Sequence, residues 1–147
     1  MAKEINTSIT INATPEKVWR ILTDFGNYGI WNPFITTISG AAEVGQKLKV
    51  TLKPENGKGM TLKPKVLVFE PEKEFRWVGH LGIPGLFDGE HRFQLIDNGD
   101  GTTTFIHSEH FRGILIPFFS KMLDVDTKNG FIAMNEQLKI RAELKET

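Results

Sequence analysis

Two histidines and a glutamate in the second half of the chain have residue types and a spacing that can support binding chemistry. His91 lies in one segment of alternating apolar and polar residues, and His107 and Glu109 lie in the next. The run Asp97-Asn98-Gly99-Asp100-Gly101 separates the segments. A run of this kind between alternating segments predicts an antiparallel hairpin. We therefore expect the three side chains on neighbouring strands.

The expected register of this hairpin brings the three side chains together. If Leu95 lies opposite Thr103, then His91 lies opposite His107, and Glu109 falls on the same inward face. The three groups can anchor the polar end of a ligand, form a hydrogen-bonded patch without a ligand role, or hold a metal ion. We favour the first two, because a metal pair needs dedicated supporting partners. No metal and no cofactor is expected.

Motifs of the common catalytic classes are missing from the sequence. It has no glycine-rich phosphate loop, no paired histidines at helical spacing, no Gly-x-Ser-x-Gly elbow and no cysteine. These absences favour binding over catalysis.

Aromatic and aliphatic residues at expected inward positions or in loops are candidates for a ligand cavity. The alternative is a purely structural role, in which these residues only fill a hydrophobic core. Taken together, a cavity with a few polar groups is the better interpretation, because ligand sites are mostly apolar. The candidates are Trp31, Phe34, Trp77, Phe87, Phe93, Phe118, Phe119, Leu123, Phe131, Met134 and Leu138, with His91, His107 and Glu109 as the polar set.

The element that must cover this cavity is a helix of about 28 residues, expected from about Pro117 to Glu146. An apolar stripe begins at Phe131 and continues at steps of three and four residues through Met134, Leu138 and Ala142. The earlier apolar set, Phe119, Met122 and Leu123, is rotated away from that stripe. We expect a kink near Asn129-Gly130, because glycine loosens a helix. Replacing Gly130 with alanine should then slow ligand entry more than it changes stability.

The rest of the chain predicts a sheet for that helix to cover. Alternation over Ile5–Ile11 indicates a strand, and Thr14-Pro15 indicates a helix start. Asp24 can cap a second short helix. About six antiparallel strands follow, with one turn at Asn56-Gly57. The fold class is therefore α+β, with a curved antiparallel sheet wrapped around a long C-terminal helix and two short helices after the first strand.

Composition limits the partners. The 147 residues fit one domain, 1–147, and 18 basic side chains balance 18 acidic ones, so nucleic acid is a poor partner. No apolar run approaches the ~18 residues of a membrane span, so we expect no integral membrane association and a cytoplasmic location. A second apolar row, Ala133, Ile140 and Leu144, either packs against the first strand or the short helices or forms a homodimer contact.

Several motifs, in this order, resemble the START-like superfamily, and more narrowly the SRPBCC proteins of the polyketide cyclase/dehydrase and lipid-transport type. The similarity covers nearly the whole chain and implies a helix-grip fold with an apolar cavity between the sheet and the C-terminal helix. It implies no common catalytic set, because such families include carriers, receptors, cyclases and co-chaperone domains. The motifs are Pro15-Glu16-Lys17-Val18-Trp19, Trp31-Asn32-Pro33-Phe34, Val66 with Phe75 and Trp77, Gly89-Glu90-His91-Arg92-Phe93, His107-Ser108-Glu109, and Gly130-Phe131 leading to Asn135 and Leu138.

The sequence thus predicts a protein that binds or transports a small hydrophobic ligand, ring-bearing or acyl, in that cavity. The alternative is an enzyme of the polyketide cyclase/aromatase kind that uses the same cavity. A third interpretation, a co-chaperone-like domain that binds a protein partner, would need an exposed apolar patch instead of an enclosed pocket. The loop Gly82–Phe87 and Gly130 are the expected points of opening.

Overall fold

The computed structural model describes residues 2–53 and 58–145, so the turn expected at Asn56-Gly57 lies outside the described residues. Within these ranges the strands are β1 (Ala2–Ile11), β2 (Ile35–Ser39), β3 (Lys49–Leu52), β4 (Met60–Leu62), β5 (Lys65–Glu70), β6 (Glu74–His80), β7 (Asp88–Asp97) and β8 (Thr103–Arg112). The helical elements are α1 (Pro15–Thr23), η1 (Phe25–Asn27), α2 (Tyr28–Trp31), α3 (Ile116–Met122), the π-helical turn η2 (Leu123–Thr127) and α4 (Lys128–Glu143).

The strands form two antiparallel sheets that meet at one edge. One sheet has the order β1-β8-β7-β6-β5, and the other has the order β2-β3-β4. The residues before β3 reach β5 through a bridge between Lys47 and Lys65 and a 2.8 Å hydrogen bond from Leu48 N to the Pro64 carbonyl. Seven strands follow the short helices instead of about six.

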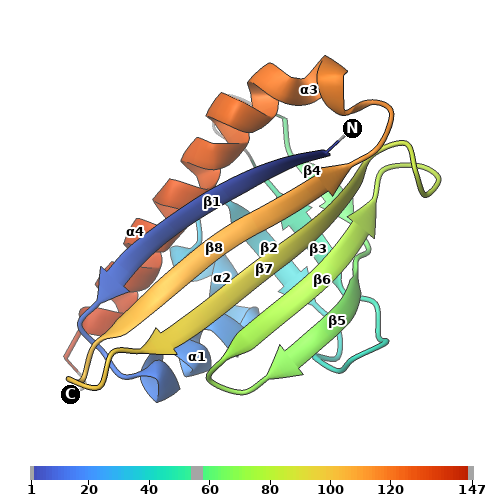
Figure 1. Cartoon of the computed structure of the whole chain (residues 1–147). Helices are drawn as coiled ribbons and strands as arrows, with labels where there is room; N and C mark the ends of the chain where they lie inside the picture. The colour runs from blue at the N-terminus through green and yellow to red at the C-terminus, as the bar shows by residue number, and fades with distance from the viewer. Residues whose placement is uncertain (1, 54–57, 146–147) are drawn as a thin grey trace.

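The long helix α3-η2-α4 lies behind the five-stranded sheet and runs along it, with the N-terminus of the chain beside α3 (Figure 1). Contacts from α4 reach β1, β8 and α1. The predicted stripe of Phe131, Met134, Leu138 and Ala142 is buried on the covered side. The helix-grip fold and the α+β class are confirmed. None of the described helices is long and apolar enough to cross a membrane.

The change of helical phase is real, but it occurs earlier than predicted. The π-turn at Leu123–Thr127 widens the helix and rotates the residues before it relative to those after it. Gly130 itself lies inside regular helix α4, so the expected kink at Asn129-Gly130 is wrong. Gly130 serves packing instead, because a Cβ there would come within 2.4 Å of Cδ1 of the Phe34 ring.

The hairpin of β7 and β8 forms where expected, with a register two residues away from the predicted one. Thr103 pairs with Asp97 and not with Leu95, so His91 lies opposite Glu109. His107 lies opposite Phe93. The three polar groups still share one face, and His91 and His107 are diagonal neighbours across the two strands.

The first short helix begins as the sequence predicts. The side chain of Thr14 accepts a hydrogen bond from Lys17 N at 3.3 Å, and Pro15 takes the first helical position. Asp24 precedes η1 but makes no side-chain cap there; it accepts from Asn27 Nδ2 at 2.6 Å.

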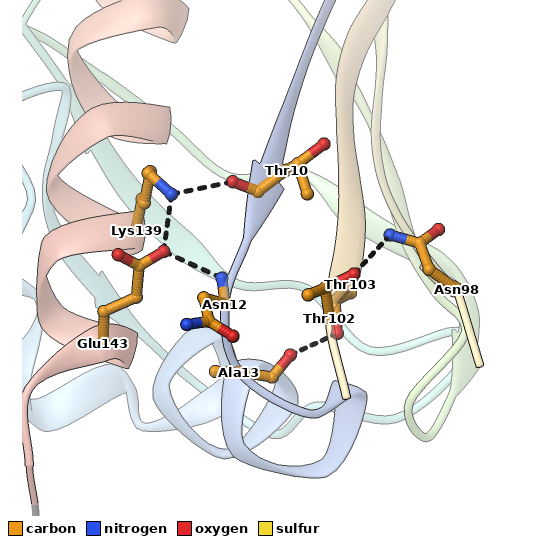
Figure 2. A network of polar contacts seen from close by, with 8 residues as sticks. All are labelled: Thr10, Asn12, Ala13, Asn98, Thr102, Thr103, Lys139 and Glu143. Carbon is orange, nitrogen blue, oxygen red and sulfur yellow. Dashed lines mark hydrogen bonds and ion pairs between the residues drawn. The ribbon is translucent and has the colours of Figure 1, made fainter. Parts of the chain in front are cut away.

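A set of polar contacts fastens the end of α4 to the end of β1 (Figure 2). Lys139 Nζ donates to the Thr10 carbonyl at 2.9 Å, and Glu143 Oε2 accepts from Asn12 N at 2.8 Å. Lys139 and Glu143 also pair with each other at 2.5 Å. Hydrogen bonds from Lys139 and Asn12 lower the pKa of the Glu143 carboxyl. The C-terminal part of the helix is thereby held to the sheet.

The second apolar row of the helix is not packed inside the fold. Ile140 is 55% exposed and Leu144 is 54% exposed, whereas Ala133 is half-buried. The expectation that this row packs against the first strand or the short helices is wrong for these two side chains. The homodimer contact through this row stays a prediction.

Candidate functional site

A cavity of about 120 Å³ lies between the five-stranded sheet, the strands β3 and β4, and the helical segment α3-η2. Each element contributes one face: the inward residues of β6, β7 and β8, the apolar face of β3 and β4, and the covered side of the helix. The wall consists of Phe34, Val50, Leu52, Met60, Leu62, Trp77, Gly79, His80, Leu81, Phe87, Gly89, His91, Glu109, Phe111, Phe119, Met122, Leu123 and Thr127.

The candidate residues divide into two groups in the structure. Those on the cavity wall are Phe34, Trp77, Phe87, His91, Glu109, Phe119 and Leu123. Those buried in the adjoining core are Trp31, Phe93, His107, Phe131, Met134 and Leu138. Phe118, expected inward or at the mouth, is 81% exposed.

Sequence reasoning missed the wall contributed by β3 and β4. The apolar face of Val50 and Leu52 is visible as alternation, but the sequence does not show which element that face meets. Phe111 could have been predicted from the sequence, because it continues the inward series of His107 and Glu109 in steps of two.

The β6–β7 loop meets the β8–α3 connection beside the cavity wall. The Phe87 ring packs edge-on against Phe119 with centroids 5.3 Å apart. The loop is joined to the connection by hydrogen bonds from Ile114 N to the Gly85 carbonyl at 3.2 Å and from Leu115 N to the Leu86 carbonyl at 3.0 Å. These contacts join the two segments next to the cavity.

A chain of hydrogen bonds leads from the cavity wall into the core. Glu109 Oε1 lies 3.0 Å from His91 Nδ1, and His91 Nε2 lies 2.7 Å from His107 Nε2. His107 Nδ1 lies 2.9 Å from Asn135 Oδ1 on α4, and Asn135 Nδ2 donates to Thr7 Oγ1 on β1 at 2.8 Å. The chain connects β7, β8, β1 and the long helix.

Both imidazoles are enclosed by aromatic rings. His91 is 1% exposed and stacks on Trp77 at 4.9 Å, and His107 is 0% exposed and stacks on Phe131 at 4.0 Å. Burial lowers the pKa of His107 well below its ordinary value of 6.5, and the neighbouring His91 lowers this pKa further. His107 is therefore neutral at physiological pH.

The polar set does not have the geometry of a metal site. The facing nitrogens of His91 and His107 bond to each other and do not converge on a shared point. Within residues 2–53 and 58–145 no group of three or more potential ligands comes together to hold a metal ion.

Comparison with known proteins places this architecture in one family. Residues 2–143 match the model of the family described as polyketide cyclase / dehydrase and lipid transport. The chain belongs to this family. No curated protein matches it in sequence.

Solved structures of other proteins share its fold. The Zhui aromatase/cyclase from Streptomyces sp. R1128 superposes with a TM-score of 0.77 at 13% identity, over 97% of this chain and 94% of that one. A START superfamily protein from Mycobacterium smegmatis gives 0.73 at 18% identity, over 95% and 97%. A norcoclaurine synthase point mutant from Thalictrum flavum gives 0.72 at 15% identity, over 97% and 94%. At these identities the likeness shows the fold alone.

Proposed function

We propose that the protein binds or carries a small hydrophobic ligand, built around one ring or a short acyl group, in the cavity beneath α3 and η2. The observation that carries the proposal is the composition of the wall. Among the described residues of the wall, aromatic and aliphatic side chains surround one carboxylate, that of Glu109. Ligand sites in proteins combine a mostly apolar lining with a few placed polar groups in this way.

The size of the cavity supports a single-ring ligand in the present conformation. A dry apolar cavity of about 150 Å³ accepts benzene, and the cavity here is about 120 Å³. Phe34, Trp77, Phe87, Phe119 and Leu123 are the proposed apolar contacts. The buried candidates behind them, such as Phe93 and Phe131, support the wall and do not touch the ligand.

A cavity-filling substitution tests this function. Toluene should bind the unmodified protein and raise its melting temperature with concentration, because a ligand that binds only the folded state stabilises it. Met122→Trp, on the cavity wall, should abolish the effect. Ile132→Trp, on an exposed side of α4, is the matched control and should retain it. If toluene fails to shift the unmodified protein, the proposal is wrong.

A cyclase-like enzyme is the second candidate, and the Glu109–His91 pair is the observation that favours it. An acid–base pair held 3.0 Å apart at the wall of an apolar cavity can exchange a proton with a bound carbonyl compound. The test is the cyclisation of a linear poly-β-ketone followed by absorbance. Glu109→Gln should reduce the rate by about a hundredfold or more while the affinity for toluene is unchanged. An equal rate for both proteins would discard this candidate.

A further inference from the structure

The hydrogen bonds that link Glu109 to Thr7 determine which atom carries the proton at each step, starting from Thr7. The Thr7 hydroxyl donates to the His107 carbonyl at 2.8 Å, which uses its one hydrogen. It therefore accepts from its second partner, the Asn135 side chain at 2.8 Å. Only the amide nitrogen of Asn135 can donate, so Asn135 Oδ1 faces His107.

The orientation of Asn135 then sets the tautomers of both histidines. A carbonyl oxygen 2.9 Å from His107 Nδ1 requires a proton on that nitrogen. His107 is fully buried and neutral, so its Nε2 carries a lone pair. The 2.7 Å contact between the two rings then needs the proton of His91 Nε2. Neither ring has a nitrogen left for a ligand.

One proton remains to be placed, between His91 Nδ1 and Glu109 Oε1. If His91 carries it, a charged imidazolium donates to a carboxylate; if Glu109 carries it, a carboxylic acid donates to a neutral imidazole. Both forms keep the 3.0 Å hydrogen bond. In both forms the other oxygen, Glu109 Oε2, has no proton and can only accept.

The structure places Glu109 Oε2 on the cavity side. A Cβ added at Gly89 would come within 2.3 Å of this atom, so glycine leaves the space that the carboxylate fills. Gly89 and Glu109 both belong to the cavity wall. Among the described residues no hydrogen-bond partner of Oε2 is found, and the Glu109 side chain is 12% exposed.

We infer that the ligand presents a hydrogen-bond donor, a hydroxyl or an amine N–H on an apolar ring, to Glu109 Oε2. The inference rests on the proposed ligand-binding function and narrows its ligand class. A carboxylate is disfavoured, because it would place two acceptors against each other in an apolar cavity. An ether or ketone is disfavoured for the same reason. In this inference Glu109 alone, and not the two imidazoles with it, anchors the polar end of the ligand.

Two other polar side chains on the described part of the wall, His80 and Thr127, do not set the preference for a ligand with a hydrogen-bond donor. His80 Nδ1 is paired with Asp88 Oδ1 at 2.7 Å and lies at the exposed rim. The Thr127 hydroxyl can donate or accept, so it favours neither kind of ligand.

Single-ring probes that differ in one group test the inference. Affinities of p-cresol, 4-methylanisole, 4-methylbenzoate and toluene are measured by NMR titration. The unmodified protein should bind p-cresol about tenfold more tightly than 4-methylanisole, since a hydrogen bond to a charged or partly charged acceptor is gained. 4-Methylbenzoate should bind most weakly.

Two substitutions at Glu109 separate the acceptor from the charge. In Glu109→Gln the amide must donate to His91 Nδ1, so its carbonyl still faces the cavity and the preference for p-cresol should persist in reduced form. In Glu109→Met the acceptor is lost, and p-cresol and 4-methylanisole should bind alike. Toluene binding reports in each case that the cavity is intact. Thr127→Val is the matched control on the opposite wall and should keep the preference.

The outcomes distinguish this inference from the proposed function. If toluene binds and 4-methylanisole or 4-methylbenzoate binds as tightly as p-cresol, the donor inference is overturned while the ligand-binding function stands. A preference that survives Glu109→Met, or disappears only in Thr127→Val, also overturns it. If no probe binds the unmodified protein, the proposed function and the inference both fail.

Discussion

At the scale of single residues, His107 makes the stability of the fold depend on pH. Its pKa in the folded protein is well below the ordinary 6.5. As the pH falls through 6.5, the unfolded chain binds a proton that the folded chain does not bind. The free energy of unfolding therefore decreases toward acid, by at most about 1.4 kcal/mol per pH unit from this group, and is constant above that range.

A comparison of the unmodified protein with His107→Gln measures this contribution. Urea unfolding at pH 7.5 and 5.5 should show that the stability advantage of the unmodified protein shrinks at the lower pH. His80 and His110 are present in both proteins, so their contributions cancel in the difference. A difference that stays constant over this pH range would contradict a neutral, buried His107.

Gly130 is a second residue whose role is local and steric. An alanine Cβ would lie 2.4 Å from Cδ1 of Phe34, which is 1% exposed and packs edge-on against Phe131 at 5.3 Å. The Phe34 ring must shift to admit this methyl group and lose part of its packing, so Gly130→Ala should lower the free energy of unfolding by about 1–3 kcal/mol. Gly26→Ala is the control, because no atom lies within 4 Å of the added Cβ, and its effect should be close to zero. Equal urea midpoints for the two variants would show that Phe34 can move.

At the scale of elements, the long helix has one firmly held part and one loosely held part. In α4, Phe131, Met134 and Leu138 are fully buried and Lys139 bonds to β1. In α3 only Ile116 is buried, and Lys3 donates to Ser120 Oγ at 3.0 Å in a part-buried contact. Lys3 also pairs with the exposed Asp124 Oδ1 of η2 at 2.8 Å. Exposed ion pairs contribute little.

Hydrogen exchange should therefore divide the helix at η2. We expect protection factors in α3 at least about tenfold lower than those in α4, because local opening follows the density of buried contacts. Toluene should raise protection in α3 and in the β6–β7 loop, which border the cavity, and leave β1 unchanged. Uniform protection along the whole helix would mean that α3 and α4 open as one unit.

Patterns along the chain predict the elements well and their local irregularities poorly. The strands and the buried stripe of α4 follow from side-chain periodicity, and the Thr14 cap follows from residue type; both are local properties. The π-turn and the bulge between Val66 and Val68 are not local properties. Each accommodates an extra residue, and its position depends on how the segments on either side pack against the rest of the fold. The bulge explains why Phe69, out of step with Val66 in sequence, still packs on Phe75 at 5.3 Å.

The sequence pattern predicted which face of the hairpin carries the polar residues, but it did not predict which residues pair. The five-residue loop Asn98–Thr102 is closed by a hydrogen bond from Asn98 N to the Thr102 carbonyl at 3.1 Å. The predicted register implied a longer loop than this one. That difference shifts every pair by two residues but keeps each side chain on its face, so the polar face was predicted and the pairing was not. The sequence also has no signal that α4 supplies Asn135 to His107.

At the scale of the whole molecule, we expect the sheet to be the fixed wall of the cavity and the β6–β7 loop with the β8–α3 connection to be its movable part. These two segments lie side by side (Figure 1). The cavity measures about 120 Å³, whereas sites for drug-sized ligands measure about 300–1,000 Å³. We therefore expect a two-ring ligand to enter only if these two segments separate, since the strands are held by their ladders.

The rate at which a ligand enters the cavity should depend on Gly113 in the β8–α3 connection. Gly113 has φ +139°, and a Cβ there would lie 2.2 Å from the Leu86 carbonyl oxygen. Gly113→Ala should thus weaken the contact between the two segments. Stopped-flow association of 2-naphthol should be slower than that of p-cresol in the unmodified protein, and Gly113→Ala should accelerate 2-naphthol selectively. Gly99→Ala, strained by a similar φ of +82° but with no atom near its Cβ, controls for general destabilisation. Equal association rates for both probes, unaffected by Gly113→Ala, would place the entrance elsewhere.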